Sequence, residues 1–110
     1  MEHDALLSAI SLCRKAGALV VGFDPVKDAV FAGKAALVLL GADLSQGSAR
    51  RMRQLCEGLV PCSPLPFTME QLSAVTRKPA GVLAVTDENL AKLCKAKLPA
   101  EKEEYNGNQI

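Results

Sequence analysis

The residue types that usually carry enzymatic chemistry are few and scattered in this chain. His3 is the single histidine among the 110 residues, and nothing in the polar segment around it would hold it in place. Nucleophilic and metal-dependent catalysis usually rely on a positioned histidine or on clustered ligands. Asp24 and Asp28 share a helix face, but a helix-capping Asp and a surface Asp account for them without catalysis. We therefore expect a protein that is not an enzyme and needs no cofactor.

The glycines do not form a phosphate-binding loop. Gly17 and Gly22 have the spacing of the Gly-x-x-x-x-Gly-Lys motif, but Phe23 stands where the motif requires a lysine. Since that lysine contacts the phosphates, the sequence offers no nucleotide site of this kind.

The four cysteines do not form a metal or redox motif. No two of them have the Cys-x-x-Cys spacing that zinc ribbons and redox sites use. Cys13, Cys56 and Cys94 fall on the apolar faces of predicted helices, where a free cysteine acts as a small hydrophobic residue. We expect buried, unreactive thiols at these positions. Cys62 follows Cys56 closely enough for the two to oxidise, which is the alternative for that pair.

The charge balance argues against indiscriminate nucleic-acid binding. Thirteen Lys and Arg residues stand against twelve Asp and Glu residues, which gives a formal net charge of +1. Proteins that bind nucleic acids through charge alone usually show a strong positive excess. The densest basic run is Arg50, Arg51 and Arg53, which do not all share one helix face. A solvated helix face is the expectation for this run, and a separate RNA-binding surface is the alternative.

The sequence carries no membrane or export signal. Residues 1–4 are polar and acidic, without the basic segment and apolar run of a signal peptide. No apolar segment approaches the roughly 20 residues that a transmembrane helix needs. We expect a cytoplasmic protein without membrane contact.

Helical and strand periodicities alternate along the chain. They predict helices over about 4–15, 24–33, 45–58, 68–77 and 87–98, and strands over about 18–21, 35–40, 60–63 and 81–85. This alternation is typical of an α/β fold, here a three-layer α/β/α sandwich around a small mixed four-stranded sheet. We expect one domain over residues 1–98 and a polar, disordered tail over residues 99–110. The prolines around the third strand predict an edge of the sheet or a strand boundary.

Two helix starts carry capping signals. After the first strand, Asp24 is expected to cap the free N–H groups and Pro25 to occupy the first helical position. Before the fourth helix, Thr68 and Gln71 have the spacing of a capping box. Both helices should therefore begin at well-defined residues.

Several short phrases stand in a characteristic order: Arg14-Lys15-Ala16-Gly17 with Gly22, Gly33-Lys34-Ala35 with Leu37-Val38-Leu39-Leu40, Ala42-Asp43, and Pro79-Ala80-Gly81-Val82 with Ala84-Val85-Thr86-Asp87. In their order and spacing, over about residues 6–97, the chain resembles the L-seven-Ae/L-thirty-e family of ribosomal and kink-turn RNA-binding proteins. It is most similar to the small bacterial members labelled ribosomal-protein-like. The resemblance implies an α/β/α sandwich that binds sharply bent RNA. It places the RNA contacts at the turn after the first strand and at the loop before the fourth helix.

The contact residues that the resemblance implies are partly replaced. The family's turn reads Gly-x-Asn-Glu-x-x-Lys, and Gly22 matches its Gly, whereas Asp24, Pro25 and Asp28 stand at the Asn, Glu and Lys positions. An ionised Asp only accepts hydrogen bonds, and Pro25 offers neither a polar side chain nor an N–H group. At the second loop, Met69 replaces a Lys.

Two functions lead for this scaffold, ahead of a ligand-binding α/β domain that would use the apolar surround of the turn. The first is a non-catalytic RNA-binding or ribosome-associated protein, in which Gly22 admits close backbone approach, Phe23 stacks on a base and cations meet phosphates. A hydrophobic staple is the equal alternative for Phe23, and a solvated lysine is the expectation for Lys27. The second is a protein-interaction module that kept the fold and lost kink-turn recognition. The candidate RNA-binding residues are Gly22, Phe23, Asp24, Lys27, Lys34, Thr68, Arg77 and Lys78.

Overall fold

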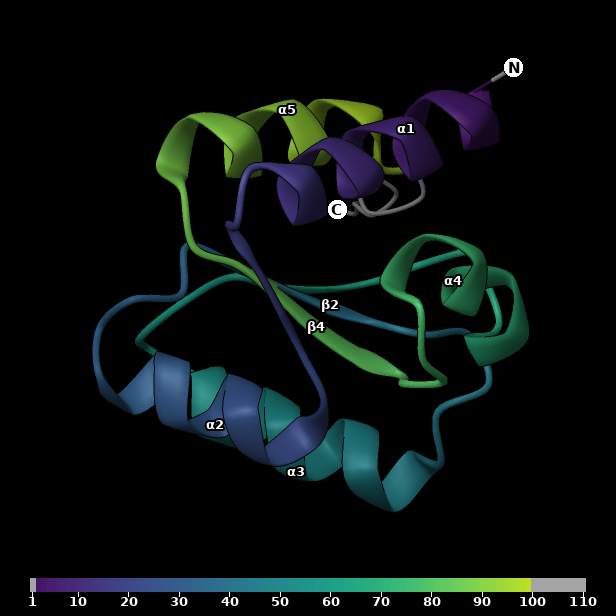
Figure 1. The fold of residues 1–110 in the computed structure, drawn as a ribbon. Helices are drawn as coiled ribbons and strands as arrows, with labels where there is room; N and C mark the ends of the chain where they lie inside the picture. The colour runs from purple at the N-terminus through teal and green to yellow at the C-terminus, as the bar shows by residue number, and fades with distance from the viewer. Residues whose placement is uncertain (1, 100–110) are drawn as a thin grey trace, which may run out of the picture.

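A computed structural model of the chain describes residues 2–99, in which five helices alternate with four strands (Figure 1). Of the predicted tail, residues 100–110 lie outside the described part. The helices are α1 (Glu2–Lys15), α2 (Phe23–Phe31), α3 (Gln46–Cys56), α4 (Met69–Thr76) and α5 (Glu88–Lys97). The strands are β1 (Leu19–Val21), β2 (Leu37–Leu40), β3 (Cys62–Pro64) and β4 (Val82–Val85).

The four strands form one mixed sheet in the order β1-β4-β2-β3. β4 runs antiparallel to both of its neighbours, with Ala84 opposite Val20 on β1 and opposite Val38 on β2. β2 and β3 are parallel, and Val38 is also the partner of Cys62. The predicted small mixed four-stranded sheet is therefore confirmed.

Helices cover both faces of this sheet, so the predicted three-layer sandwich is also confirmed (Figure 1). α1, α4 and α5 pack on one face, and α2 and α3 pack on the other. Successive residues of the two central strands point to opposite faces, and both faces are covered. This is why β2 and β4 read as continuous apolar runs. The residues facing α1, α4 and α5 are Leu37, Leu39, Leu83 and Val85, and those facing α2 and α3 are Val38, Leu40, Val82 and Ala84.

The two edge strands differ from their predictions in detail. β1 begins one residue later than predicted, and its three residues are only half-buried, because it forms one edge of the sheet. β3 forms the other edge, as the prolines indicated, yet it lies further along the chain than predicted and includes Pro64. The carbonyl of Pro61 accepts a hydrogen bond from the Val38 N–H at 2.9 Å, so the parallel ladder begins there. An edge position tolerates a proline because no partner needs its N–H.

One end of the sheet gathers the beginnings of two helices. The ends of β1 and β2 lie beside the start of β4, where the Gly22 N–H donates to the Val82 carbonyl at 2.9 Å and the Gly41 N–H donates to the Gly81 carbonyl at 2.7 Å. α2 starts directly after Gly22, and the loop after Gly41 reaches the start of α4. We call this end of the sheet, from Gly22 across Gly81 to Gly41, the glycine edge.

Among the helices of residues 2–99, none has the length and apolar character that a bilayer crossing requires.

Candidate nucleic-acid interface

The turn between β1 and α2 is set by Gly22. Its dihedral angles, φ 111° and ψ 151°, lie in a region that is essentially restricted to glycine. Its N–H continues the pairing with β4, while its carbonyl accepts from the Val26 N–H at 3.0 Å and closes the first turn of α2. Strand pairing thus passes into the helix within a single residue.

The predicted cap of α2 is wrong, because the helix begins two residues earlier than the capping pattern indicated. Gly22 is the N-cap residue and makes no side-chain cap hydrogen bond, and Asp24 lies inside the first turn. Pro25 is the third residue of the helix, where its missing N–H costs nothing because the first four N–H groups have no intrahelical acceptor. Asp24 is exposed and favours the helix only through the dipole.

Two backbone donors at this turn therefore remain open. Within residues 2–99, neither the Phe23 N–H nor the Asp24 N–H has a hydrogen-bond acceptor. Both lie at the positive end of the α2 dipole, which attracts anions. The Asp24 carboxylate lies in the same turn and opposes an approaching phosphate, so the open donors and the acidic side chain act against each other.

Phe23 packs against the protein, but not as a staple that precedes the helix, because it is the first residue of α2 and its ring meets Arg51 of α3. The ring is half-buried against the cluster of apolar side chains beneath α2 and α3. The Arg51 guanidinium carbon lies 4.7 Å from the ring centroid, within the range of a cation–π contact. Phe23, Lys27 and Arg51 line a shallow hollow of about 340 Å³ together with Gln54 and Leu55. Stacking of Phe23 on a base stays a prediction.

The sequence-predicted cations do not all reach this turn. Lys27 is half-buried at the hollow, whereas Lys34 is exposed beyond the far end of α2. A nine-residue helix is about 14 Å long, so Lys34 is separated from Gly22 by that length. Arg77 and Lys78 are exposed at the far end of α4. Arg77 ends that helix with a left-handed conformation, φ 72°, and its N–H donates to the Ser73 carbonyl.

The start of α4 is closed by protein groups. Thr68 and Gln71 form the predicted capping box, in which the Gln71 N–H donates to Thr68 Oγ1 at 3.2 Å and the Thr68 N–H donates to Gln71 Oε1 at 2.8 Å. The Met69 N–H donates to Asp43 Oδ1 at 2.8 Å. Asp43 thus occupies the place where a phosphate would meet this helix. Sequence reasoning missed this bond, which joins residues 26 positions apart.

Met69 also shapes the glycine edge through its side chain. A Cβ atom built on Gly81 would lie 3.3 Å from the Met69 sulfur and 2.9 Å from a methyl carbon of Leu44. Both apolar side chains therefore lie directly over the Gly81 backbone. Met69 stands where the L-seven-Ae/L-thirty-e family has a lysine, and it covers the sheet edge instead of presenting a charge.

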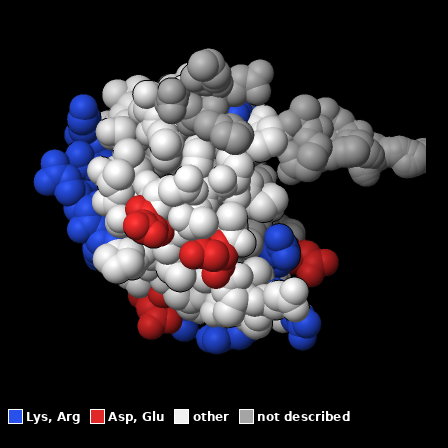
Figure 2. All heavy atoms as spheres, turned by 90° about the vertical axis from the view of Figure 1, so that its right-hand side faces the viewer, with Lys and Arg blue, Asp and Glu red and all other residues white. Residues whose placement is uncertain are grey.

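The surface near α4 is not uniformly basic. Figure 2 shows the molecule from the side on which Figure 1 places α4. The middle of that face is largely uncharged and includes acidic groups. Cations gather along its left margin and also at its lower edge, and the lower edge is where Figure 1 places the layer of α2 and α3. An anionic ligand at this face would therefore meet cations only at its rim.

The three arginines of α3 serve different surfaces, as their spacing predicted. Arg51 faces Phe23, whereas Arg50 and Arg53 line a separate groove between α3 and β3. The sequence indicated the different faces of these side chains, but it could not indicate the groove, because β3 is brought to α3 by the sheet.

The cysteines are buried or half-buried free thiols. Cys13 and Cys94 bring their sulfur atoms to 3.7 Å, a contact between α1 and α5 that the sequence did not indicate. This hydrogen bond raises the pKa of Cys94 and lowers that of Cys13. Burial raises the pKa of Cys62 to about 12, so this thiol stays protonated at neutral pH. Among the side chains that the structure describes, those of residues 5–99, no three His, Cys, Asp or Glu residues gather as a metal site would require.

Comparison with known proteins supports the fold. No protein-family model matches the chain, and no curated protein matches its sequence. A protein of unknown function from Bacillus halodurans C has a TM-score of 0.79 and 23% identity, over 84% of this chain and 94% of that chain. The 15.5kD RNA-binding protein of Giardia lamblia has a TM-score of 0.68 and 19% identity, over 84% of this chain and 81% of that chain. At these identities, the chain shares with both proteins the α/β/α fold.

Proposed function

We propose that this protein is a non-catalytic RNA-binding protein of the L-seven-Ae/L-thirty-e type, which recognises a sharply bent RNA at the glycine edge. The observation that carries the proposal is the open start of α2. The Phe23 and Asp24 N–H groups have no acceptor in residues 2–99 and lie at the positive end of a helix dipole. Backbone donors of this kind bind phosphate oxygens without the help of a particular side chain.

The fold and the neighbouring residues support this reading. The chain shares its fold with an RNA-binding protein of Giardia lamblia. Gly22 carries no side chain, so the sugar-phosphate backbone of an RNA can approach the turn closely. Lys27 and Arg51 supply positive charge beside the turn, and Phe23 offers an aromatic surface next to them. A kink-turn motif, free or within ribosomal RNA, is the finer form of this proposal.

The replaced contacts predict the strength and character of binding. Asp43 and Met69 close the start of α4, so most of the contact falls to α2. Contacts from cations and backbone donors to phosphates give affinity that decreases as salt increases, with little base discrimination. We therefore expect binding to be strongly salt-dependent and directed by the bent shape of the RNA.

The test is a titration of two labelled RNAs at low and moderate salt. One RNA contains a kink-turn, and the other is a duplex of the same length without the unpaired residues that create the bend. The proposal predicts micromolar or tighter binding to the bent RNA, weaker binding to the duplex, and a loss of affinity with Lys27→Ala. Absence of binding at both salt concentrations would reject kink-turn recognition.

A protein partner is the second candidate, and the acidic groups on the α4 side favour it. The Asp43 carboxylate accepts a hydrogen bond from the Met69 N–H, where an external anion would otherwise bind α4. The side chains of Met69 and Leu44 cover Gly81. An interaction module would use this apolar and acidic face without RNA. Capture of a partner by the wild-type protein, unchanged by Lys27→Ala and lost with Met69→Glu, would favour this candidate if the bent RNA does not bind.

A further inference from the structure

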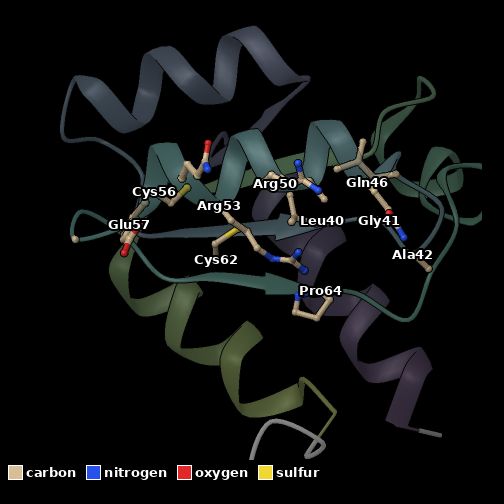
Figure 3. Close-up of a pocket in the computed structure, with 15 residues that line it drawn as sticks. Leu40, Gly41, Ala42, Gln46, Arg50, Arg53, Cys56, Glu57, Cys62 and Pro64 are labelled. Atoms are coloured by element: carbon tan, nitrogen blue, oxygen red, sulfur yellow. The ribbon is translucent and has the colours of Figure 1, made fainter.

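A groove of about 750 Å³ lies between α3 and the edge strand β3, beside the turn site but separate from it. Its floor includes Leu40, Cys56 and Cys62, and Arg50 and Arg53 line it from α3 (Figure 3). Figure 3 shows Arg53 extending from α3 across the sheet edge towards Pro64. The groove therefore combines an apolar floor with a positively charged wall.

The two arginines of the groove have no counterion among the side chains of residues 5–99. Both are exposed, and neither forms an ion pair with a carboxylate in that part of the chain. Arg53 lies close enough to Cys62 to lower the pKa of that thiol in part, against the larger opposite effect of burial. Glu57 lines the groove one turn of α3 beyond Arg53, so the positive part of the wall is the part nearer the glycine edge.

The chemistry of the walls selects the class of ligand. Residues three apart on a helix have Cβ atoms about 5–6 Å apart, so Arg50 and Arg53 can meet neighbouring anionic groups of one extended ligand. The planar guanidinium group matches the geometry of a phosphate. Pro64 lies on the free edge of β3 and has no N–H to donate, which disfavours an added peptide strand. These features favour a phosphodiester chain over a peptide.

The groove also connects to the site already described. Gly41 and Ala42 line one end of it, and the Gly41 N–H donates to the Gly81 carbonyl at 2.7 Å at the glycine edge. An RNA held at the start of α2 thus lies beside the entrance of the groove. We propose that the groove binds a single-stranded arm of that RNA, with its phosphates on Arg50 and Arg53 and its bases or riboses over the apolar floor. This inference rests on the proposed RNA-binding function.

The experiment compares two double variants on two RNAs. Arg50→Gln/Arg53→Gln removes the charges of the groove, and Lys92→Gln/Lys95→Gln removes two charges at the same spacing from α5, where both side chains are exposed. One RNA carries a single-stranded arm beyond the bend, and the other ends at the bend. Thermal unfolding of both variants checks that the fold is retained, as expected for exposed positions.

We expect the arginine variant to bind the long RNA about tenfold more weakly, because two phosphate contacts are lost. The salt dependence of binding, as a slope of log K against log salt, should fall by about 1.4 for a single strand. The lysine variant should bind both RNAs as wild type does, and the arginine variant should bind the short RNA as wild type does.

Other outcomes separate the inference from the proposed function. If both double variants bind the long RNA equally well, the groove proposal is wrong and the proposed function stands. Equal losses on the long and short RNAs would assign the arginines to the bend itself and also overturn the groove proposal. Tight binding of labelled oligoglutamate through Arg50 and Arg53, with RNA binding unaffected, would assign the groove to an acidic peptide. If wild type binds neither RNA, both the function and the inference fail.

Discussion

The guanidinium carbon of Arg51 lies 4.7 Å from the centroid of the Phe23 ring, and this contact joins the middle of α3 to the first residue of α2. The contact holds the Phe23 side chain beside the open N–H groups of Phe23 and Asp24. A base that stacks at this turn must therefore meet the free face of the ring or the outer face of the guanidinium group. The contact also makes the stability of the turn depend on α3.

We predict that Phe23 and Arg51 are energetically coupled by about 0.5–1 kcal/mol, the range of exposed cation–π pairs. A double-mutant cycle with Phe23→Leu and Arg51→Gln, followed by urea unfolding, measures this coupling. Arg53→Gln is the matched control, because Arg53 lines the other groove and should show no coupling to Phe23. Coupling of equal size with both arginines would contradict a specific contact.

The conformation of Gly22 predicts an unusual cost for a small substitution. Gly22→Ala should lower the free energy of unfolding by about 1–3 kcal/mol, because φ 111° and ψ 151° lie outside the region that other residues adopt. Gly47→Ala is the control, since Gly47 lies within α3 and a Cβ there meets no atom within 4 Å. That variant should gain about 0.5–1 kcal/mol. Denaturant unfolding that ranks the two variants in the opposite order would refute this account of the turn.

Asp43 should stabilise α4 through its bond to the Met69 N–H. Asp43→Ala removes the acceptor and should cost about 0.5–2 kcal/mol, as the loss of a helix cap does. Asp43→Asn keeps an oxygen at the same place and should cost less. Thermal unfolding of the two variants gives the comparison, and equal losses would show that the charge of Asp43, and not its hydrogen bond, stabilises the helix.

The raised pKa of Cys62 predicts a loss of stability at high pH. The folded-state value of about 12 exceeds the ordinary value of 9.0, so the unfolded chain ionises this thiol first. The stabilising contribution is complete below pH 9 and is lost progressively as pH rises towards 12. Cys62→Ala should therefore show a smaller decrease in unfolding free energy between pH 8 and pH 10.5 than wild type. Parallel curves for the two proteins would mean that the Cys62 thiol does not titrate differently on folding.

Local sequence patterns predicted the elements well because periodicity and capping act over a few residues. The capping box at Thr68 and Gln71 and the fully buried runs of β2 and β4 are examples. The start of α2 was misassigned because the hydrogen bond between Gly22 and Val82 joins distant parts of the chain. Because of that bond, strand pairing continues to Gly22 and α2 begins at Phe23, so Asp24 lies inside the helix.

The candidate site was less accessible to sequence reasoning, since most of its contacts are tertiary. Asp43 bonds to Met69 from 26 positions away, and Arg51 reaches Phe23 only because α3 packs beside α2. The sequence indicated which residues differ from the contact residues of the L-seven-Ae/L-thirty-e family, and the structure gives the consequences of those differences. The start of α4 is closed by Asp43, whereas the start of α2 is open.

The most direct test of RNA recognition at the glycine edge is the response of the backbone amides there. We would titrate ¹⁵N-labelled protein with kink-turn RNA and follow the amide resonances of residues 2–99. The account predicts that the Phe23 and Asp24 resonances shift and saturate together with others around Gly22, while those of α5 stay in place. If these resonances remain unchanged at excess RNA, or if only distant amides respond, the glycine edge is not an RNA-binding site.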